Sequence, residues 1–560
     1  MCGIAGIVGH DATPERVTAM FLAQTHRGPD GGGCFIHPTQ PVGLAHNRMA
    51  IVETGPLGQQ PMQSSNGRYT IVFNGEIYNA LELRQELANS YPFHSHSDTE
   101  VILAAYQTWG KDCLSRFNGQ WAFAIWDDRE QQLFCARDRL GVRPLLIYDY
   151  GDSCYFASEA KAFLAAGITL RPDYQAWARY LTYGTYSTSR TFFDNVIQLP
   201  PGQWCCIALS GERMGGRFWN PSQEPDQHSP TWRVMELRRL LEDSVKLRLR
   251  ADVPIGLNYS GGLDSSIILH LMHELLPRET PLWLFQGLFD HAGYDEEITG
   301  WKQHLARPVN LVNTWTDPMN VSQYASSIMA QEEMPFGGIN TIMYHQVHRE
   351  AQFRNVKVLL EGQGADELFG GYAYYQQSGQ HQDGSSYLRP DLATSQAQEL
   401  AGTPSVMVPR ITGDIFWGKL PRVLLVHDRV AMTYGRELRQ PYLDYRVAQL
   451  ALQTPDTEKI VGHQGKAILR EAARGLVPEG VRTAPKQGRT DPQVEWLRCL
   501  LAPWVRSLFE APDFGWGLVE RAGVIDAYRK FCAGEGENGM MIWQWINLAL
   551  WFRRFGAPSC

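Results

Sequence analysis

The segment that most constrains this chain is a short run of glycine, serine and aspartate, SGGLDSS, at Ser260–Ser266. Val253, Ile255 and Leu257 precede it and indicate a β-strand, and apolar residues at 267, 268, 271, 272 and 275 share one helical face behind it. The segment is therefore expected at a helix N-terminus, where backbone N–H groups and the helix dipole favour an anion. Glycines allow close approach and hydroxyls add donors, so the pattern predicts a phosphate loop.

The residues of this phosphate loop indicate which phosphate chemistry it serves. It contains no lysine, unlike the GxxxxGK[ST] loop of enzymes that transfer a γ-phosphate. Asp264 is available to Mg²⁺, which suits a bound pyrophosphate; an ordinary Gly/Ser turn is the alternative. SGGLDSS resembles the loop of the ATP pyrophosphatases, which cleave ATP between the α- and β-phosphates. That resemblance implies ATP contacts from Leu257, Tyr259, Ser260, Gly261, Gly262, Asp264, Ser265 and Ser266.

Length and composition describe an ordinary globular protein with more than one domain. A chain of 560 residues is too long for a single core. Its net charge of −8 does not favour nucleic acid or an anionic membrane as partner, and it has no apolar run near the ~18 residues of a membrane span. The start, MCGIAGIVGHD, lacks the basic region of a signal peptide. Ten cysteines without CxxC pairs favour reduced thiols and a cytoplasmic location.

The N-terminal region offers a nucleophile and an oxyanion site. If Met1 is removed, Cys2 carries a thiol beside an α-amine of pKa near 8, which can act as its base; a buried structural cysteine is the alternative. A strand from Tyr69 to Phe73 runs into Asn74-Gly75, a hairpin or loop signal that also offers a side-chain amide beside a backbone N–H. Further on, Ser97 or Asp98 could simply cap the helix that follows.

Five short motifs in this region resemble one family. MCGIAGI, HRGPD, HNRMAI, FNGEIYN and SDTE follow the order and spacing of the class II glutamine amidotransferase domain, an N-terminal-nucleophile glutaminase. One departure is Asn47, where that family often has Arg. The resemblance implies a nucleophile and base at Cys2, an oxyanion site at Asn74 and the Gly75 N–H, and glutamine contacts from Arg48 (α-carboxylate), Asp98 (ammonium), Glu76, Ile51, Asn74 and Gly75.

A second motif follows the strand Val356–Leu360. It reads EGQGADELFGGY, from Glu361 to Tyr372, at the strand end where open α/β sheets bind ligands. Asp366 is therefore expected to meet Asp264 and share Mg²⁺, with a purely structural Asp366 as the alternative.

The second motif resembles the asparagine-synthetase sequence [SD]G[EQ]GADE[LV]FGGY. This implies ATP contacts from Glu361 and Gly362. Glu361 stands where Ser or Asp is usual, and Gln363 stands where many members have Glu, so an acid–base role cannot be assumed there.

The last third of the chain adds one candidate catalytic residue. Lys486 lies in a segment similar to the family's K-x-G-F, with Arg489 in place of Phe, and it is predicted to stabilise charge at the adenylylated carboxylate; a solvated lysine is the alternative. The region 373–418 begins as a polar, irregular stretch and is expected to be a loop or insertion near the site. The apolar run Met541–Phe555 is expected to be a packed helix, because it is too short for a membrane span.

Together these patterns predict an α/β protein of two domains. Residues 1–212 are expected to form an αββα sandwich glutaminase, 213–231 a linker, and 232–560 a parallel-sheet synthetase domain of the pyrophosphate-loop type with many helices. The resemblance to glutamine-hydrolysing asparagine synthetases spans nearly the whole chain. It implies glutamine-dependent amidation of a carboxylate through an acyl-adenylate, with ATP converted to AMP and pyrophosphate.

The sequence is compatible with three functions. The first is an asparagine synthetase, whose acceptor is L-aspartate. The second is an amidotransferase of a biosynthetic cluster that acts on another acid, such as a uronic acid, a peptide or a small natural-product carboxylate, and the third is a non-catalytic protein that keeps the folds. The expected ligands are L-glutamine, ATP, Mg²⁺ and the acceptor, with L-aspartate favoured. No nucleic-acid or membrane partner is expected, and a homodimer is left open.

Overall fold

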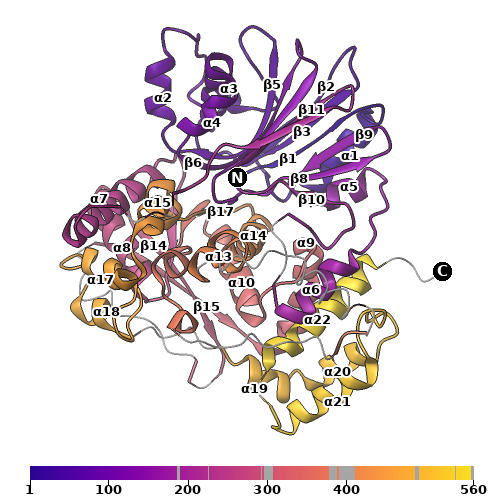
Figure 1. The fold of residues 1–560 in the computed structure, drawn as a ribbon, viewed down its shortest axis with the longest axis vertical. Coiled ribbons are helices and arrows are strands. Elements are labelled where there is room, and N and C mark those ends of the chain that lie inside the picture. The colour runs from indigo at the N-terminus through magenta and orange to yellow at the C-terminus, as the bar shows by residue number, and fades with distance from the viewer. Residues whose placement is uncertain are drawn as a thin grey trace.

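The computed structural model shows two halves in close contact (Figure 1). It describes residues 1–185, 189–222, 224, 226–291, 293–294, 305, 307–376, 387–389, 392, 410–485, 491–536 and 538–556.

The N-terminal half is built from two antiparallel six-stranded sheets. The first has the order β10 (Ile197–Gln198), β8 (Leu146–Tyr150), β9 (Ser153–Ala157), β1 (Gly3–Val8), β3 (Val42–Arg48) and β2 (Gly31–Ile36). The second has the order β12 (Arg213–Arg217), β11 (Gln203–Ala208), β7 (Gln132–Arg137), β6 (Gly119–Asp127), β5 (Tyr69–Ile77) and β4 (Met62–Gln63).

Alternation along the strands explains why the two sheets stack between helices. On β5, Val72 packs into the apolar layer between the sheets, while its neighbours Ile71 and Phe73 pack against helices on the outer face. Those outer helices are α2 (Ala80–Leu87), α3 (Asp98–Trp109) and α4 (Cys113–Arg116), and α1 (Pro14–Ala23) and α5 (Lys161–Ala165) cover the other sheet. The predicted αββα sandwich is confirmed.

The C-terminal half is organised around a five-stranded parallel sheet. Its order is β15 (Val309–Thr316), β14 (Leu282–Phe289), β13 (Ile255–Asn258), β16 (Val358–Leu360) and β17 (Glu437–Arg439). The chain builds outward from β13 to β15 on one side and from β16 to β17 on the other. The strand order therefore reverses between β13 and β16, and the crevice at their carboxyl ends is where such sheets bind ligands.

Helices cover this sheet and form a separate packed layer beside it (Figure 1). The longer helices around the sheet are α7 (Pro230–Arg248), α8 (Leu263–Leu275), α9 (Val321–Glu332), α10 (Ile339–Phe353), α14 (Lys419–Met432) and α15 (Tyr445–Gln453). Short helices are α11 (Ala365–Phe369), α13 (Arg410–Phe416), α16 (Asp456–Lys459), α17 (Ala467–Ala472) and α18 (Glu479–Thr483), and the C-terminal layer holds α19 (Gln493–Arg498), α20 (Ala502–Glu510), α21 (Arg521–Cys532) and α22 (Gly539–Phe555).

The C-terminal helix α22 is a core element, as its aromatic sequence predicts. Trp543, Trp545 and Trp551 are buried, and Trp551 packs on Trp177 of α6 (Tyr174–Tyr183) from the N-terminal half. Among the described residues, none of the helices combines the length and apolarity that crossing a membrane requires. The helix therefore ties the two halves of the chain together.

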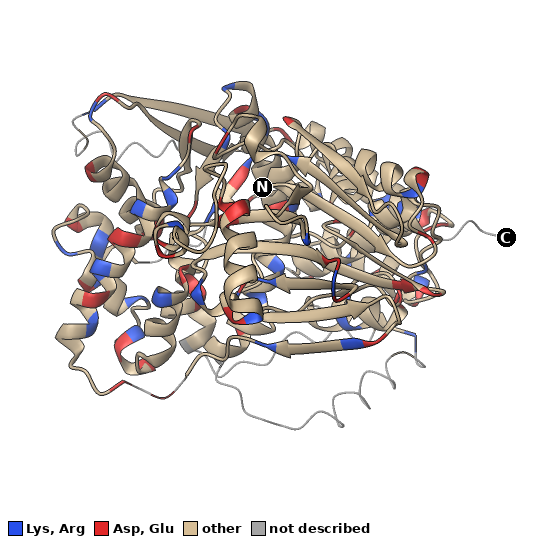
Figure 2. Cartoon of the chain, turned by 90° about the horizontal axis from the view of Figure 1, so that it is seen from above, with Lys and Arg blue, Asp and Glu red and all other residues tan. Residues whose placement is uncertain are grey.

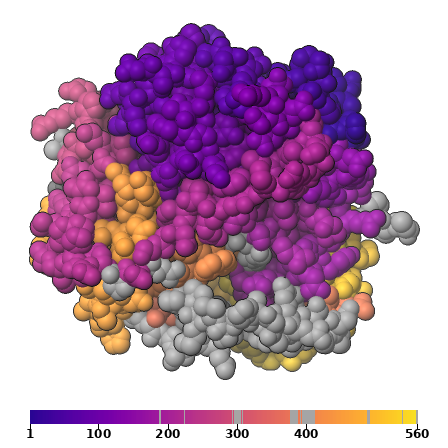
Figure 3. All heavy atoms as spheres, turned by 45° about the horizontal axis from the view of Figure 1, so that its top comes forward, coloured from indigo at the N-terminus to yellow at the C-terminus, as the bar shows by residue number. Residues whose placement is uncertain are grey.

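The two halves of the chain are in direct contact, and buried ion pairs join them. Acidic and basic positions are interspersed along the elements in Figure 2. In Figure 3 the indigo N-terminal region lies directly on magenta segments that follow it in the chain. Buried ion pairs cross this contact: Arg27 bonds Asp428 of α14 at 2.8 Å, and Arg143 reaches the same carboxylate at 3.3 Å. Asp428 thus joins the two halves through buried ion pairs.

Two local predictions differ from the structure. The predicted linker is shorter, because Arg213–Arg217 forms β12 on β11, and α7 begins at Pro230. Gly215 and Gly216 resemble a linker in composition, but Gly216 packs on the Trp204 ring.

The second difference concerns Asn74-Gly75. These residues do not form a turn; they continue β5, opposite Ala122 and Trp121 of β6. A β-carbon on Gly75, at φ +154°, would overlap the Gln120 carbonyl oxygen, so close strand approach explains this glycine.

Candidate active sites

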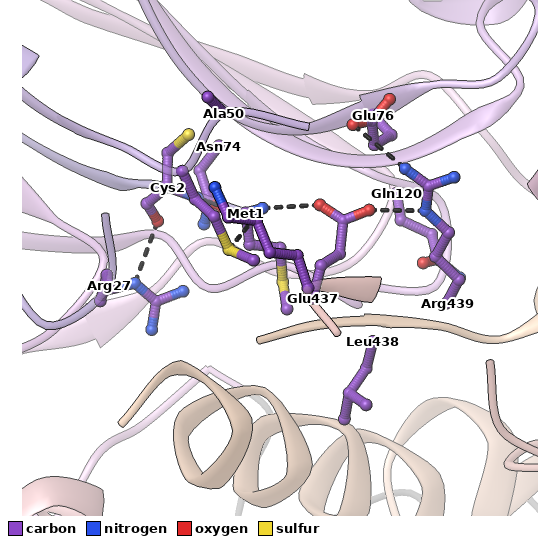
Figure 4. A network of polar contacts seen from close by, with 12 residues as sticks. Met1, Cys2, Arg27, Ala50, Asn74, Glu76, Gln120, Glu437, Leu438 and Arg439 are labelled. Carbon is purple, nitrogen blue, oxygen red and sulfur yellow. Dashed lines mark hydrogen bonds and ion pairs between the residues drawn. The ribbon is translucent and has the colours of Figure 1, made fainter. Parts of the chain in front are cut away.

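The first candidate site lies where β1 and β5 come together. Cys2 directly precedes β1, and its backbone N–H donates to Asn74 Oδ1 at 2.9 Å (Figure 4). Its carbonyl oxygen accepts from Arg27 Nε at 3.0 Å. Burial raises the pKa of the Cys2 thiol. A neutral thiol in this position requires a base before it can attack a substrate.

The amide of Asn74 has the geometry of an oxyanion donor. Its Oδ1 is engaged by Cys2, while its Nδ2 is buried and has no hydrogen-bond partner among the described residues. A buried amide N–H without a partner is costly unless a ligand accepts its hydrogen bond. The Nδ2 atom is thus available beside the thiol-bearing residue.

Met1 is enclosed rather than solvent-exposed. It is 1% exposed, and its ammonium lies 2.6 Å from Glu437 Oε2, on strand β17 of the other half (Figure 4). With Met1 attached, the Cys2 nitrogen belongs to a peptide bond and cannot accept a proton. Removal of Met1 is therefore needed for the predicted base. The sequence predicts no role for Glu437.

Carboxylates gather on one side of this site. Arg439 bonds Glu437 at 2.6 Å and Glu76 at 3.3 Å. Ser97 caps α3, which leaves Asp98 free to accept the Ile77 N–H at 2.9 Å. Burial raises the pKa of Asp98 to about 6 and also raises that of Glu76. Clustered carboxylates of raised pKa form an environment that favours a cationic ligand.

Arg48, the last residue of β3, and Ile51, in the loop that follows it, approach the same site. The Arg48 guanidinium donates to the Gly55 carbonyl at 2.7 Å and to the Glu53 carbonyl. The Ile51 side chain is buried, and its carbonyl accepts from the Asp252 N–H at 3.0 Å. These contacts fix the orientation of the Arg48 side chain and of the loop that carries Ile51.

The second candidate site is the phosphate loop at the switch point of the parallel sheet. Gly262 is the N-cap residue of α8, and because it has no side chain it makes no capping hydrogen bond to the N–H groups of the first turn. Gly261 before it has φ +73°. Ser265 Oγ lies 3.1 Å from Ser260 Oγ and donates to the Gly262 carbonyl at 3.2 Å. The loop thus presents uncapped helix N–H groups, the geometry of an anion site.

The structure supports the predicted proximity of the two aspartates. Asp264 lies in the first turn of α8 and Asp366 on α11, and Lys466 Nζ bonds them at 2.6 and 2.8 Å. Two carboxylates facing a phosphate loop fit Mg²⁺, which proteins usually hold with one or two carboxylates plus substrate phosphates. The described residues contain no cluster of three or more potential metal ligands. Sequence reasoning assigned no role to Lys466.

The neighbouring motif residues differ in what their side chains do. A β-carbon on Gly362 would lie 2.9 Å from the Asp264 Cβ, so this glycine permits the close approach of the two loops. Glu361 bonds His427 Nδ1 at 3.1 Å and accepts from Gln440 Nε2 at 2.8 Å. Burial alone would raise the pKa of Glu361, but His427 and Gln440 outweigh it and lower the pKa. Any nucleotide contact by Glu361 therefore falls to its backbone.

Some predicted positions lie outside the described residues. These are Lys486, Arg489 and the polar stretch 377–386. The predicted polar insertion at 373–418 is described only in its first four residues, at 387–389 and 392, and from 410 onward.

A chain of hydrogen-bonded, buried side chains lies between the two sites. Gln120, next to Trp121 opposite Gly75, donates to the Gln440 carbonyl at 3.5 Å, and the Gln440 side chain bonds Glu361. All three side chains are buried at the contact between the halves. These two sites, in one chain, define the class of ligase that carries its own glutaminase.

Comparison with known proteins identifies the family. The model of a glutamine amidotransferase domain matches residues 1–219, and the asparagine synthase model matches residues 236–411 and 419–553. The chain belongs to the asparagine synthase family. It is an ATP-dependent carbon–nitrogen ligase with glutamine as amide donor.

Relatives from distant organisms cover most of the chain. Asparagine synthetase [glutamine-hydrolyzing] 1 of Bacillus subtilis is 29% identical over 98% of this chain and 96% of its own length. A putative asparagine synthetase of Mycobacterium tuberculosis is 29% identical over 99% and 95%. A fungal protein of Gibberella zeae, named Amidase chry2, is 28% identical over 83% and 74%.

Proposed function

We propose that the acceptor is L-aspartate and that the chain forms L-asparagine from aspartate, glutamine and ATP. The observation that carries the ligase half of this proposal is the pairing of Asp264 and Asp366 beside a lysine-free phosphate loop. Aspartate is favoured because the relatives matching nearly the full chain are named asparagine synthetases. Gln363 and the relative named an amidase support the alternative, a different acid.

At the N-terminal site the chain's own residues account for glutamine hydrolysis. After removal of Met1, the α-amine of Cys2 takes the thiol proton, and sulfur attacks the glutamine amide carbon. Asn74 Nδ2 and the Gly75 N–H stabilise the oxyanion. The carbon–nitrogen bond breaks as the proton passes to the leaving ammonia, and water then hydrolyses the glutamyl thioester.

Substrate orientation is assigned to the charged groups around Cys2. Arg48 pairs with the α-carboxylate of glutamine, and Asp98 and Glu76 hold its ammonium. Ile51 lines this pocket. Burial raises the pKa of Asp98, and the ammonium of glutamine would supply a countercharge that offsets the effect of burial.

At the C-terminal site an acceptor carboxylate oxygen attacks the α-phosphorus of ATP, and pyrophosphate leaves into the loop Ser260–Ser266. Mg²⁺, when bound, neutralises phosphate charge, and Asp264 and Asp366 would hold it. Ammonia then attacks the acyl carbon, loses a proton, and releases AMP. Lys486 stays the proposed partner of the adenylylated carboxylate. Ammonia that is to remain unprotonated must travel inside the protein, from the site at Cys2 to the site at the phosphate loop.

The proposal includes the domain division and the cellular setting. A glutaminase domain, a linker and a synthetase domain remain the proposed division, with the linker shortened to the segment between β12 and α7. A cytoplasmic location remains a prediction from the cysteine pattern, and a homodimer is left open.

The decisive experiment measures pyrophosphate and AMP with purified chain, glutamine, ATP–Mg²⁺ and a panel of acids. Aspartate-dependent pyrophosphate release in step with AMP is expected. Stoichiometric ADP would contradict the mechanism. If glutaminase activity is present but aspartate gives no pyrophosphate, another acid of the panel is the acceptor. Intact mass of the same sample checks that Met1 has been removed.

A further inference from the structure

Lys466 is held in place by its backbone as well as by its ion pairs. It directly precedes α17 with φ +59°, a left-handed conformation that non-glycine residues seldom adopt, and its N–H donates to the Phe369 carbonyl at 3.0 Å. Backbone strain of this kind persists only where surrounding contacts enforce it. The side chain is 6% exposed. Its position is therefore specified by the fold and is not that of a surface lysine.

The glycines of the FGGY segment make room for this lysine. A β-carbon on Gly371 would overlap both the Asp366 carboxylate and the Lys466 side chain. A β-carbon on Gly465 would overlap the Gly370 carbonyl oxygen, where the two segments cross. The FGGY segment, which the sequence places at the nucleotide site, therefore also forms the space that the Lys466 side chain occupies.

Burial orders the three charges relative to solvent. The side chains of Asp264 and Asp366 are 19% and 21% exposed, whereas Lys466 is 6% exposed. A metal ion arriving from solvent meets two carboxylates that already share an ammonium on their inner side. Mg²⁺ dehydrates reluctantly and usually needs phosphate oxygens besides one or two carboxylates. The ammonium removes part of the negative charge that free Mg²⁺ would require.

We propose that Lys466 is the resident cation of this site and restricts metal entry to the complex with nucleotide or pyrophosphate. The inference rests on the proposed metal role of Asp264 and Asp366. Without a polyphosphate, the lysine satisfies both carboxylates and free metal binds weakly. The phosphates bring the additional negative charge that makes the metal complex favourable. The two aspartates then serve as an ordered site that fills only together with its substrate.

The test counts bound metal and needs no turnover. Full-length protein is dialysed to equilibrium against Mn²⁺, a probe for Mg²⁺, with and without inorganic pyrophosphate. Wild type should bind Mn²⁺ at this site only when pyrophosphate is present. Lys466→Gln should bind one Mn²⁺ without pyrophosphate, with affinity raised about tenfold or more, because a neighbouring positive charge has been removed. Adding Asp264→Asn to that variant should abolish the gain.

Two control variants separate charge from packing. Lys466→Arg keeps the cation and should retain the wild-type dependence on pyrophosphate. Lys459→Gln removes another buried lysine, which pairs with Asp456 at 3.1 Å outside either site, and should also behave as wild type.

Wild type and Asp264→Asn decide the matter even if Lys466→Gln does not fold. Tight Mn²⁺ binding by wild type without pyrophosphate, removed by Asp264→Asn, would overturn the proposal. If Asp264→Asn still binds Mn²⁺ in the presence of pyrophosphate as wild type does, Asp264 is not a metal ligand. That outcome overturns the metal assignment and the lysine inference with it, whereas failure of aspartate as acceptor leaves both untouched.

Discussion

Replacing Asp98 by Asn should stabilise the protein and weaken glutamine binding at the same time. Asp98 is 9% exposed and carries its charge in a poorly solvated pocket, where burial raises its pKa to about 6 from an ordinary 3.8. At 1.36 kcal/mol per pH unit, ionising it in the folded state costs about 3 kcal/mol. Asn keeps the shape and can still accept from the Ile77 N–H without that cost.

The pH dependence gives this prediction a sign. Because the folded carboxyl binds its proton more tightly than the unfolded one, wild type loses stability relative to Asp98→Asn as pH rises from about 4 to 6. The two proteins should match below pH 4, and the full difference should be present above pH 6. At roughly 2–4 °C per kcal/mol for a unit of 150–250 residues, a clear upward Tm shift is expected at pH 8.

The assay combines thermal unfolding with glutaminase kinetics between pH 4 and 8. Losing a charged partner for the glutamine ammonium should raise the KM of Asp98→Asn by about ten- to a hundredfold, since hydrogen bonds to charged groups contribute ~1.5–3 kcal/mol. Asp112→Asn, an exposed carboxylate of the same half, serves as control and should show neither effect. A Tm difference that does not change with pH, or a less stable Asp98→Asn at pH 8, would refute the reasoning.

Four further substitutions test other parts of the molecule. Cys2→Ala should abolish glutamine-dependent synthesis but retain ammonia-dependent synthesis; loss of both in folded protein would show that the sites are inseparable. Asn74→Ala should lower glutaminase kcat by about 10²–10³-fold, and an unchanged kcat would exclude Nδ2 as oxyanion donor. Gly371→Ala should suppress pyrophosphate formation through overlap with Asp366 while glutamine hydrolysis continues, measured side by side. Arg27→Met removes the cation shared by the buried carboxylates Glu159 and Asp428, which keep Lys161 and Arg143 as partners, and should cost about 3 kcal/mol, seen as a lower Tm.

The sequence predicts those parts of the sites that depend on local pattern. The repeat of apolar residues changes at the phosphate loop from every second residue, as in a strand, to every 3.6 residues, as in a helix. This change predicts the position of the loop between the two elements. Asp264 and Asp366 meet because β13 and β16 are neighbours, with Leu257 beside Leu360, and both loops leave the same edge of the sheet. A parallel sheet with alternating helices is enough to anticipate that meeting.

Contacts between distant segments carry no such signal. Lys466 lies 202 residues from Asp264 in sequence and reaches it because the start of α17 packs against α11, where the Lys466 N–H bonds the Phe369 carbonyl. Glu437 and Arg439 have no role that the sequence predicts, although they face the glutaminase site of the other half. Asn74-Gly75 has turn composition, yet pairing with β6 overrides that local preference.

Strand β17 has a consequence for attempts to recombine the two halves. Within three residues it bonds Met1 and Glu76 on one side, and the Arg439 carbonyl accepts from the Glu361 N–H on the other. A chimera that grafts a foreign glutaminase onto this synthetase would leave two buried charges facing new neighbours. An exchange of glutaminase domains would therefore need to include Glu437–Arg439, although this strand belongs to the sheet of the other half.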